Sequence, residues 1–141
     1  AKTAIDRAGQ LAKAHGVRRA MMLPVSAPFH CSLMRPAADA MADALAKVAV
    51  RKPRVPLVAN VRAAPISEPA DIVASLIDQV TGTVRWRESI QFMVQSGVST
   101  FYEIGAGRVL SGLIKRIAEA AETSSIGSPD DIARFKTAVR G

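Results

Sequence analysis

Apolar residues along the chain follow two rhythms, one typical of helices and one typical of buried strands. Repeats of three to four residues predict helices over residues 5–12, 34–48, 72–80, 86–94 and 109–117, with a last helix after Ser128. Short apolar runs predict strands over residues 20–25, 55–61 and 100–104, and a weaker strand around Ser125 and Ile126. This alternation is typical of an α/β architecture with mostly parallel strands.

Glycine, proline and capping residues mark the ends of several of these elements. Gly16 and Gly82 follow helical repeats and are predicted to end them. Ser128 precedes Pro129 at the first helical position and an acid, Asp131, at the third, which predicts a capped helix start. The chain has no repeat and no clear linker, and its pattern begins inside a helix, so we expect the C-terminal part of a larger protein.

Composition narrows the class of protein. Of the 141 residues, 49% are apolar, 22% charged and 4% aromatic, which is typical of a globular domain and not of a disordered chain. No apolar run approaches the roughly 20 residues that cross a bilayer, and the N-terminus has no hydrophobic signal core. We therefore predict no membrane partner. The single cysteine, Cys31, permits no internal disulfide, which is typical of a cytoplasmic protein.

A net charge of +7 suggests a negatively charged partner. The basic residues are dispersed, and the four phenylalanines, one tyrosine and one tryptophan do not interleave with them, so we predict no nucleic-acid partner. An acidic protein or a phosphorylated ligand accounts for the charge. A solvated basic surface without a partner accounts for it as well.

The glycine-rich stretch GAGRVLSG, residues 105–112, follows a predicted strand and precedes a predicted helix. Leu110 occupies the place of the third glycine in the dinucleotide fingerprint, and no acidic residue follows at the expected distance. We therefore expect a tight turn and no nucleotide cofactor. His15 and His30 lie on different elements without metal-ligand spacing, which predicts no metal site.

The stretch LPVSAPFHCSLM, residues 23–34, carries the most suggestive polar group, His30. Pro24 and Pro28 stiffen the approach to it. A stiff loop suits a preorganised general base, and it is equally an ordinary way to leave a strand, so the pattern leaves both roles open. Cys31 would need an activating base to serve as a nucleophile, and His30, its immediate neighbour in the sequence, has poor geometry for that. We therefore expect Cys31 to be a small buried residue.

Three further stretches follow one another along the chain: LPVSAPFHCSLMRPAADAMADAL, PRVPLVANV and VRWRESIQFMVQSGVSTFYEIGAGRVLSGLIKRI. In their residues, order and spacing they resemble the C-terminal half of the malonyl-CoA:acyl-carrier-protein transacylase family, and the similarity runs from about Ala4 to Arg134. The resemblance implies an α/β-hydrolase-like large subdomain with a ferredoxin-like insertion. Residues 1–25 would be the last helix and strand of the small subdomain, and residues 26–141 the C-terminal part of the large one.

The resemblance also implies a chemistry, which is ping-pong transfer of a malonyl group from CoA to the phosphopantetheine thiol of acyl carrier protein in fatty-acid biosynthesis. The family's catalytic histidine falls on His30, which on this resemblance would act as general base and then as general acid. The backbone carbonyl that orients this imidazole falls on Gln79. No cofactor beyond the two substrates is implied.

Two further matches concern substrate binding. Phe29 falls on a position associated with acyl selectivity, where a bulky ring favours malonyl over methylmalonyl groups. Its alternative role is a core phenylalanine. Arg18 and Arg19 match a basic pair that meets CoA phosphates, and a solvated turn is the alternative for them.

The family's G-H-S-x-G nucleophile, its carboxylate-binding arginine and its oxyanion hole have no counterpart in these 141 residues. We therefore expect the chain to be inactive alone and to require the missing N-terminal half as a partner, beside malonyl-CoA and acyl carrier protein. Two alternatives stay open. The chain could derive from an acyltransferase domain of a polyketide synthase, or be a non-catalytic fragment that binds an acidic partner.

Overall fold

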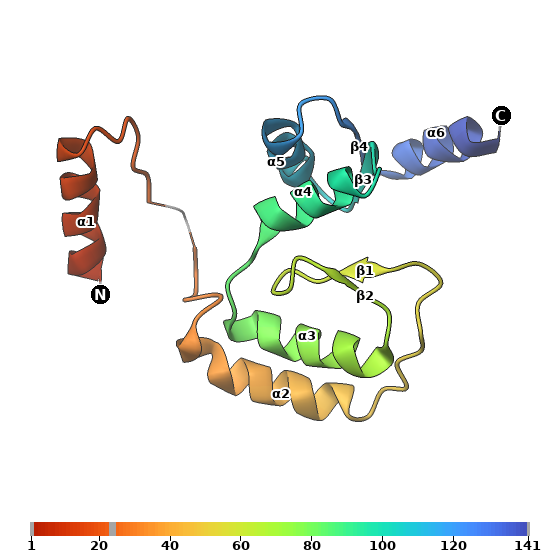
Figure 1. Ribbon diagram of the computed structural model, residues 1–141, viewed down its shortest axis with the longest axis horizontal. Coiled ribbons are helices and arrows are strands. Elements are labelled where there is room, and N and C mark those ends of the chain that lie inside the picture. Colours follow the sequence, from red (N-terminus) through yellow and green to blue (C-terminus); the bar gives the residue numbers. More distant parts are fainter. Residues whose placement is uncertain (1, 23–24, 141) are drawn as a thin grey trace.

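The computed structural model describes residues 2–22 and 25–140 and has an α/β architecture (Figure 1). The helices are α1 Lys2–Ala14, the short 3-10 helix η1 Ser32–Met34, α2 Arg35–Leu45, α3 Pro69–Thr81, α4 Trp86–Gln95, α5 Val109–Ile117 and α6 Pro129–Arg140. The strands are β1 Leu57–Val58, β2 Pro65–Ile66, β3 Thr100–Ile104 and β4 Glu122–Ile126. None of the described helices is both long enough and apolar enough to cross a bilayer.

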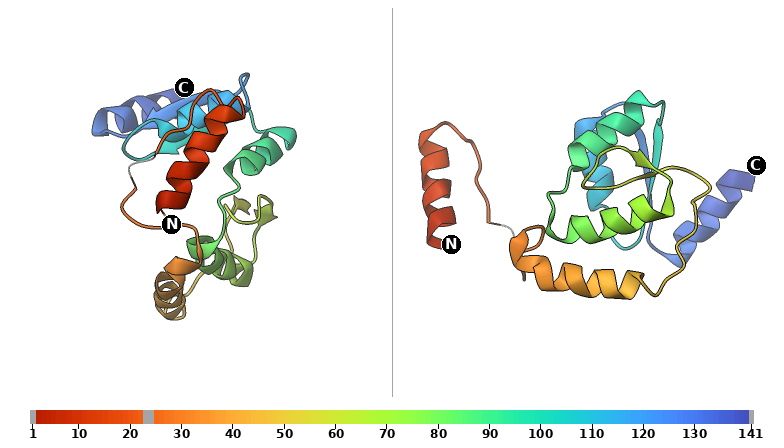
Figure 2. Two further views of the ribbon diagram at one scale, coloured as in Figure 1. Left: turned by 90° about the vertical axis from the view of Figure 1, so that its left-hand side faces the viewer. Right: turned by 60° about the horizontal axis from the view of Figure 1, so that its bottom comes forward.

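All six predicted α-helices are confirmed. Residues close to their ends account for where several of them stop or start. At the end of α1, Gly16 adopts a left-handed φ of 80°. The amide of Gly16 donates to the Lys13 carbonyl at 3.1 Å, and that of Val17 donates to the Ala12 carbonyl at 3.0 Å. These paired bonds satisfy carbonyls that the helix itself leaves open. α1 has no buried residue and lies apart from the other helices (Figures 1 and 2).

The strands form two small sheets of different kinds. β3 and β4 run parallel, with Thr100 opposite Glu122 and Ile104 opposite Ile126, and α5 connects them. This pair confirms the predicted parallel arrangement and both predicted strands. β1 and β2 instead form an antiparallel hairpin of two residues each, which contradicts the prediction of a longer strand over 55–61. The strand stops because the chain reverses at Ala59, whose carbonyl accepts the amides of Arg62 and Ala63.

The predicted strand over residues 20–25 is wrong for the described part of that run. Ala20 to Met22 and Val25 are irregular, and the side chains of Met21, Met22 and Val25 are exposed. Leu23 and Pro24 lie outside the described residues. An apolar run becomes a strand only when a neighbouring strand takes its backbone groups, and no described segment does so here.

Two apolar clusters hold the described elements together. Ala59, Ile66 and Ile72 pack the hairpin onto α3, which α2 contacts along its other side (Figure 1). The second cluster joins α4 and α5 to the β3–β4 sheet, and its buried members are Ile90, Ile114 and Ala121. The connection between α3 and α4 therefore links the two clusters.

The loop after β3 confirms the expected tight turn. Gly105 and Gly107 have φ values of 135° and 102°, a region that side chains other than glycine rarely adopt. The turn lets the Glu103 carboxylate accept the amides of Leu110 and Ser111 at 3.0 and 2.8 Å, at the start of α5. Hydrogen bonds from the Ser111 hydroxyl and then its amide lower the pKa of the Glu103 carboxyl. Glu103 is therefore a helix cap.

The start of α6 confirms the predicted capping by Ser128. The Asp131 amide donates to the Ser128 hydroxyl at 3.2 Å, and the Asp131 carboxylate accepts the Ser128 amide at 2.9 Å. The Ser128 hydroxyl, the Gly127 amide and Arg134 all stabilise the charged carboxylate and lower the pKa of Asp131 to about 2. Reciprocal capping of this kind fixes the direction in which a helix leaves its loop.

The lowered pKa predicts an acid-sensitive contribution to stability. Because the folded pKa of Asp131 lies below its usual value of about 3.9, this contribution is present above that pH and is lost as the pH falls toward about 2. We expect the Asp131→Asn variant to lose less stability than the parent between about pH 5 and about pH 2, measured by thermal unfolding.

Asp130→Asn is the matched control, since the hydrogen bonds that a carboxylate accepts at the start of α6 go, among the described side chains, to Asp131 and none goes to Asp130. The control should keep the parent's pH dependence. If Asp131→Asn kept it as well, the capping carboxylate would not be its source.

Candidate functional site

His30 lies on the loop that leads into η1 and α2, and its backbone is unusual. Its φ is 58°, in the left-handed region, which non-glycine residues seldom occupy and which often marks a functional turn. The turn is held by the Phe29 amide, which donates to the Ala27 carbonyl at 2.9 Å. The backbone therefore presents the imidazole outward from a tight turn, with its side chain exposed.

Cys31 serves this same turn. Its thiol donates to the Pro28 carbonyl at 3.1 Å, and its own carbonyl accepts the Met34 amide at 3.0 Å to begin η1. The residue is half-buried, less than the sequence suggested. Both bonds are used in shaping the loop that carries His30.

The structure brings His30 and Gln79 together, although they are 49 positions apart in the sequence. Nδ1 of His30 lies 2.9 Å from the backbone oxygen of Gln79. A carbonyl only accepts, so Nδ1 carries a hydrogen, and in the neutral imidazole Nε2 then has the free lone pair. Gln79 lies in the last turn of α3, where carbonyls lack intrahelical partners and carry the negative end of the helix dipole.

The end of α3 keeps this carbonyl open. The Gly82 amide donates to the Asp78 carbonyl at 2.8 Å, and the chain then turns to an extended conformation with ψ of 157°. A β-carbon at Gly82 would lie 2.9 Å from both the Asp78 oxygen and Cγ1 of Val61. Only glycine fits this contact, so the predicted helix stop at Gly82 is confirmed and its cause is close packing.

Asn60 belongs to the same arrangement and was missed by the sequence analysis. Its Nδ2 donates to Oε1 of Gln79 at 3.3 Å, and its backbone oxygen accepts the Arg85 amide at 2.8 Å. The sequence placed Asn60 inside a predicted strand. Its one available signal was that asparagine is depleted in strands and common in turns.

A cleft of about 200 Å³ opens beside this group, between the hairpin and α3. It is mostly apolar, and Asn60 and Gln79 line it together with Ser75. The Ser75 hydroxyl is buried and has no hydrogen-bond partner among the described residues.

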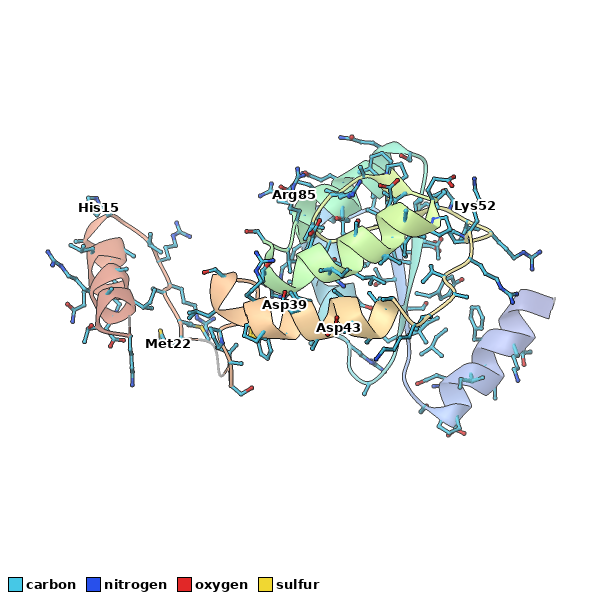
Figure 3. All side chains as sticks on the ribbon, turned by 90° about the horizontal axis from the view of Figure 1, so that it is seen from below. His15, Met22, Asp39, Asp43, Lys52 and Arg85 are labelled. Atoms are coloured by element: carbon cyan, nitrogen blue, oxygen red, sulfur yellow. The ribbon has the colours of Figure 1, made fainter. Side chains whose placement is uncertain are left out.

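The other predicted binding residues are exposed in the structure. Phe29 adjoins His30 and its side chain is 54% exposed, so it is not a core residue here. Arg18 and Arg19 are exposed on the segment after α1. That segment also carries His15, which Figure 3 shows at the end of α1, away from α2 and α3. No group of three potential metal ligands converges within residues 2–22 and 25–140.

Trp86 and Ser89, at the start of α4, lie in or beside the second apolar cluster. The Ser89 hydroxyl is buried and donates to the Arg85 carbonyl at 2.8 Å, one turn back in α4. Trp86 packs against Ile90, Ile114 and Ala121, and its indole nitrogen is buried without a partner in the described structure. These contacts fix the start of α4, next to the Arg85 amide that Asn60 binds.

Known proteins match nearly the whole chain, although no family model does. A malonyl CoA-acyl carrier protein transacylase of Salmonella typhimurium is 44% identical over 128 residues, which are 91% of this chain and 41% of that protein. The solved acyl-carrier-protein S-malonyltransferase of Bartonella henselae superposes with a TM-score of 0.87 at 45% identity, over 99% of this chain and 44% of its own.

A solved complex of a type II PKS acyl-carrier protein with its malonyl-transacylase also matches, with a TM-score of 0.83 and 38% identity. That match covers 96% of this chain and 44% of the solved one. The resemblance expected from the sequence is therefore confirmed. The chain spans about two fifths of the length of the curated relatives it matches.

The close packing at Gly82 predicts an unusually costly glycine-to-alanine change. In Gly82→Ala the new methyl group overlaps a backbone oxygen and a Val61 methyl, so the last turn of α3 must shift. We expect a loss of about 1–3 kcal/mol in the free energy of unfolding, measured by denaturant titration.

Gly112→Ala is the matched control. Gly112 lies within α5, and a β-carbon there meets nothing within 4 Å. This variant should be unchanged or up to about 1 kcal/mol more stable, because alanine favours a helix over glycine. Equal effects of the two substitutions would contradict the packing argument.

Proposed function

We propose that this chain, a relative of the malonyl CoA-acyl carrier protein transacylases along nearly its whole length, supplies the general base of such an enzyme. The observation that supports the proposal best is the 2.9 Å hydrogen bond between Nδ1 of His30 and the Gln79 carbonyl. Two segments far apart in sequence meet there to orient one imidazole, and the free Nε2 is the nitrogen that a base needs.

The proposed reaction transfers a malonyl group in two steps. A serine hydroxyl attacks the thioester of malonyl-CoA while Nε2 of His30 takes its proton, and the imidazolium returns that proton to the departing CoA thiolate. The phosphopantetheine thiol of acyl carrier protein then gives its proton to Nε2 and attacks the seryl ester. The serine oxygen leaves with that proton, and the enzyme is restored.

The geometry at His30 suits both steps. The Gln79 carbonyl selects the tautomer with a free Nε2, and it also accepts a hydrogen bond from the imidazolium formed in each step. Carbonyls at a helix end interact favourably with a cation. The left-handed turn and the hydrogen bonds of Cys31 and Phe29 hold the loop that carries the ring, so little reorientation is needed during the reaction.

The nucleophile must come from outside these residues. The 141 residues contain no G-x-S-x-G sequence, and relatives are more than twice as long as the region they share with this chain. We propose that the serine, the carboxylate-binding arginine and the oxyanion hole lie in the part of the enzyme that this chain does not cover. Residues 1–141 alone are then inactive.

The subdomain division is also a proposal. Residues 26–141 would belong to the α/β-hydrolase-like large subdomain and residues 1–25 to the ferredoxin-like small one. Its support is that α1 buries none of its residues and lies apart from α2 to α6 (Figure 2). Arg18 and Arg19 would then meet CoA phosphates from the small subdomain, and the exposed Phe29 ring would restrict the acyl group beside His30.

The proposed acceptor is an acyl carrier protein of fatty-acid or polyketide synthesis. Its support is that curated relatives are named for transfer to acyl carrier protein, and that a matching structure holds a type II PKS carrier. The chain's net charge of +7 would attract a partner of negative charge.

The first test replaces the proposed base in the complete enzyme that carries this chain. We expect His30→Ala to lower kcat/KM for malonyl transfer by about 10²–10⁴-fold, because a general base in this role contributes that much. Gln79→Ala should cost less than about tenfold, because the orienting group is a main-chain carbonyl and survives the substitution.

Thermal unfolding of both variants provides the control for folding. Near-normal transfer by a folded His30→Ala enzyme would falsify the proposed function. A Gln79→Ala enzyme as impaired as His30→Ala would show that the carbonyl is not the relevant group.

The second test concerns the carrier. If charge guides docking, raising sodium chloride from about 50 mM to about 500 mM should weaken carrier binding to the complete enzyme by about tenfold, since salt screens exposed charges. Binding is measured by calorimetric titration. An affinity that does not change with salt would exclude electrostatic docking.

A further inference from the structure

The hydrogen bond to His30 depends on where the last turn of α3 holds the Gln79 carbonyl. Gln79 is the third residue from the end of α3, and the Gly82 amide closes the helix on Asp78. The last turn of a helix is held by fewer backbone bonds than its middle and moves more easily. An imidazole oriented by this carbonyl therefore needs a second group that fixes the turn.

Asn60 contacts both sides of the connection between α3 and α4. Its Nδ2 donates to Oε1 of Gln79 at 3.3 Å, before the connection, and its backbone oxygen accepts the Arg85 amide at 2.8 Å, after it. The carboxamide bond is a good match in either orientation, because each amide has one donor and one acceptor end. Asn60, a single residue shortly after β1, thus joins the two helices that flank the connection.

Asn60 is itself held firmly. It follows Ala59, which is buried in the first apolar cluster and whose carbonyl accepts the amides of Arg62 and Ala63 at 3.1 and 3.0 Å. Its other neighbour, Val61, packs against Gly82 at the end of α3. The side chain of Asn60 is half-buried, so water competes less for its bond to Gln79.

We propose that Asn60 is a positioning residue for the base: its carboxamide fixes the last turn of α3 through the Gln79 side chain, and so keeps the Gln79 carbonyl in place for His30. Asn60 acts through Gln79, and its side chain forms no hydrogen bond to the imidazole in the described structure. This inference rests on the proposed function of His30.

The expected effect is on the chemical step more than on substrate binding. Without the carboxamide the carbonyl drifts, and the imidazole spends less time in the reactive orientation. We expect Asn60→Ala to lower kcat for malonyl transfer by roughly three- to fivefold, a loss no larger than that in Gln79→Ala, and to leave KM for malonyl-CoA within about twofold, measured on the complete enzyme. The NMR signal of the His30 Nδ1 hydrogen should broaden or move.

Asn60→Asp is the conservative variant. An aspartate has the same size and its carboxylate accepts from the other end of the Gln79 amide, so it should retain more activity than Asn60→Ala. Glu68→Gln is the matched control, because it weakens the exposed pair with Lys52 at the opposite end of α3. Figure 3 shows Lys52 and Arg85 at opposite sides of this helix. The control should leave kcat and the His30 signal unchanged.

A double-mutant cycle with Gln79→Ala tests the route of the effect. If Asn60 acts through the Gln79 side chain, the double variant should be no worse than the poorer single one. Multiplied effects would overturn the proposal, and so would an unchanged kcat and an unchanged His30 signal in a folded Asn60→Ala enzyme. Loss of activity in His30→Ala with none in Asn60→Ala refutes this inference alone, whereas an active His30→Ala enzyme refutes the proposed function.

Discussion

A helix cannot satisfy the carbonyls of its own last turn, and this constraint organises the candidate site. In α3 the carbonyl of Gln79 is free of helical partners, and Nδ1 of His30 donates to it at 2.9 Å. The Gln79 carbonyl stays free because α3 ends at Gly82, where only a hydrogen atom fits between Asp78 and Val61. The imidazole reaches this carbonyl from a left-handed turn at His30. The site is therefore a helix ending whose acceptor is used to orient one ring.

Local signals explain why the helices were predictable and two strands were not. Gly16 and the Ser128–Asp131 box act within a few residues of the helix end that they stabilise. The run over 20–25 is apolar enough for a strand, but strand formation depends on a neighbour that no nearby residue specifies. Residues 55–61 supply only the first, two-residue strand of a hairpin with Pro65–Ile66, because the turn at Ala59 competes with a longer strand.

The site itself was only partly accessible from the sequence. Pattern analysis found His30 because prolines and a predicted helix surround it, yet it could not separate a base from a turn residue. Its pairing with Gln79 came from family resemblance, since a main-chain acceptor leaves no mark on residue type. Asn60 was missed because an apolar run surrounds it, and its role depends on a fold that brings residues 60, 79 and 85 together.

The described strands also connect stability to the proposed chemistry. Each sheet has two strands, a size that is marginal alone, and Tyr102 and Ile104 on one face of β3 are 49% and 81% exposed. Apolar side chains at that exposure gain most from a covering partner. If the serine-bearing part of the enzyme covers this face, the association that brings the nucleophile to His30 also stabilises the sheet. Assembly and activity would then rise together, and residues 26–141 would bind no substrate productively before that association.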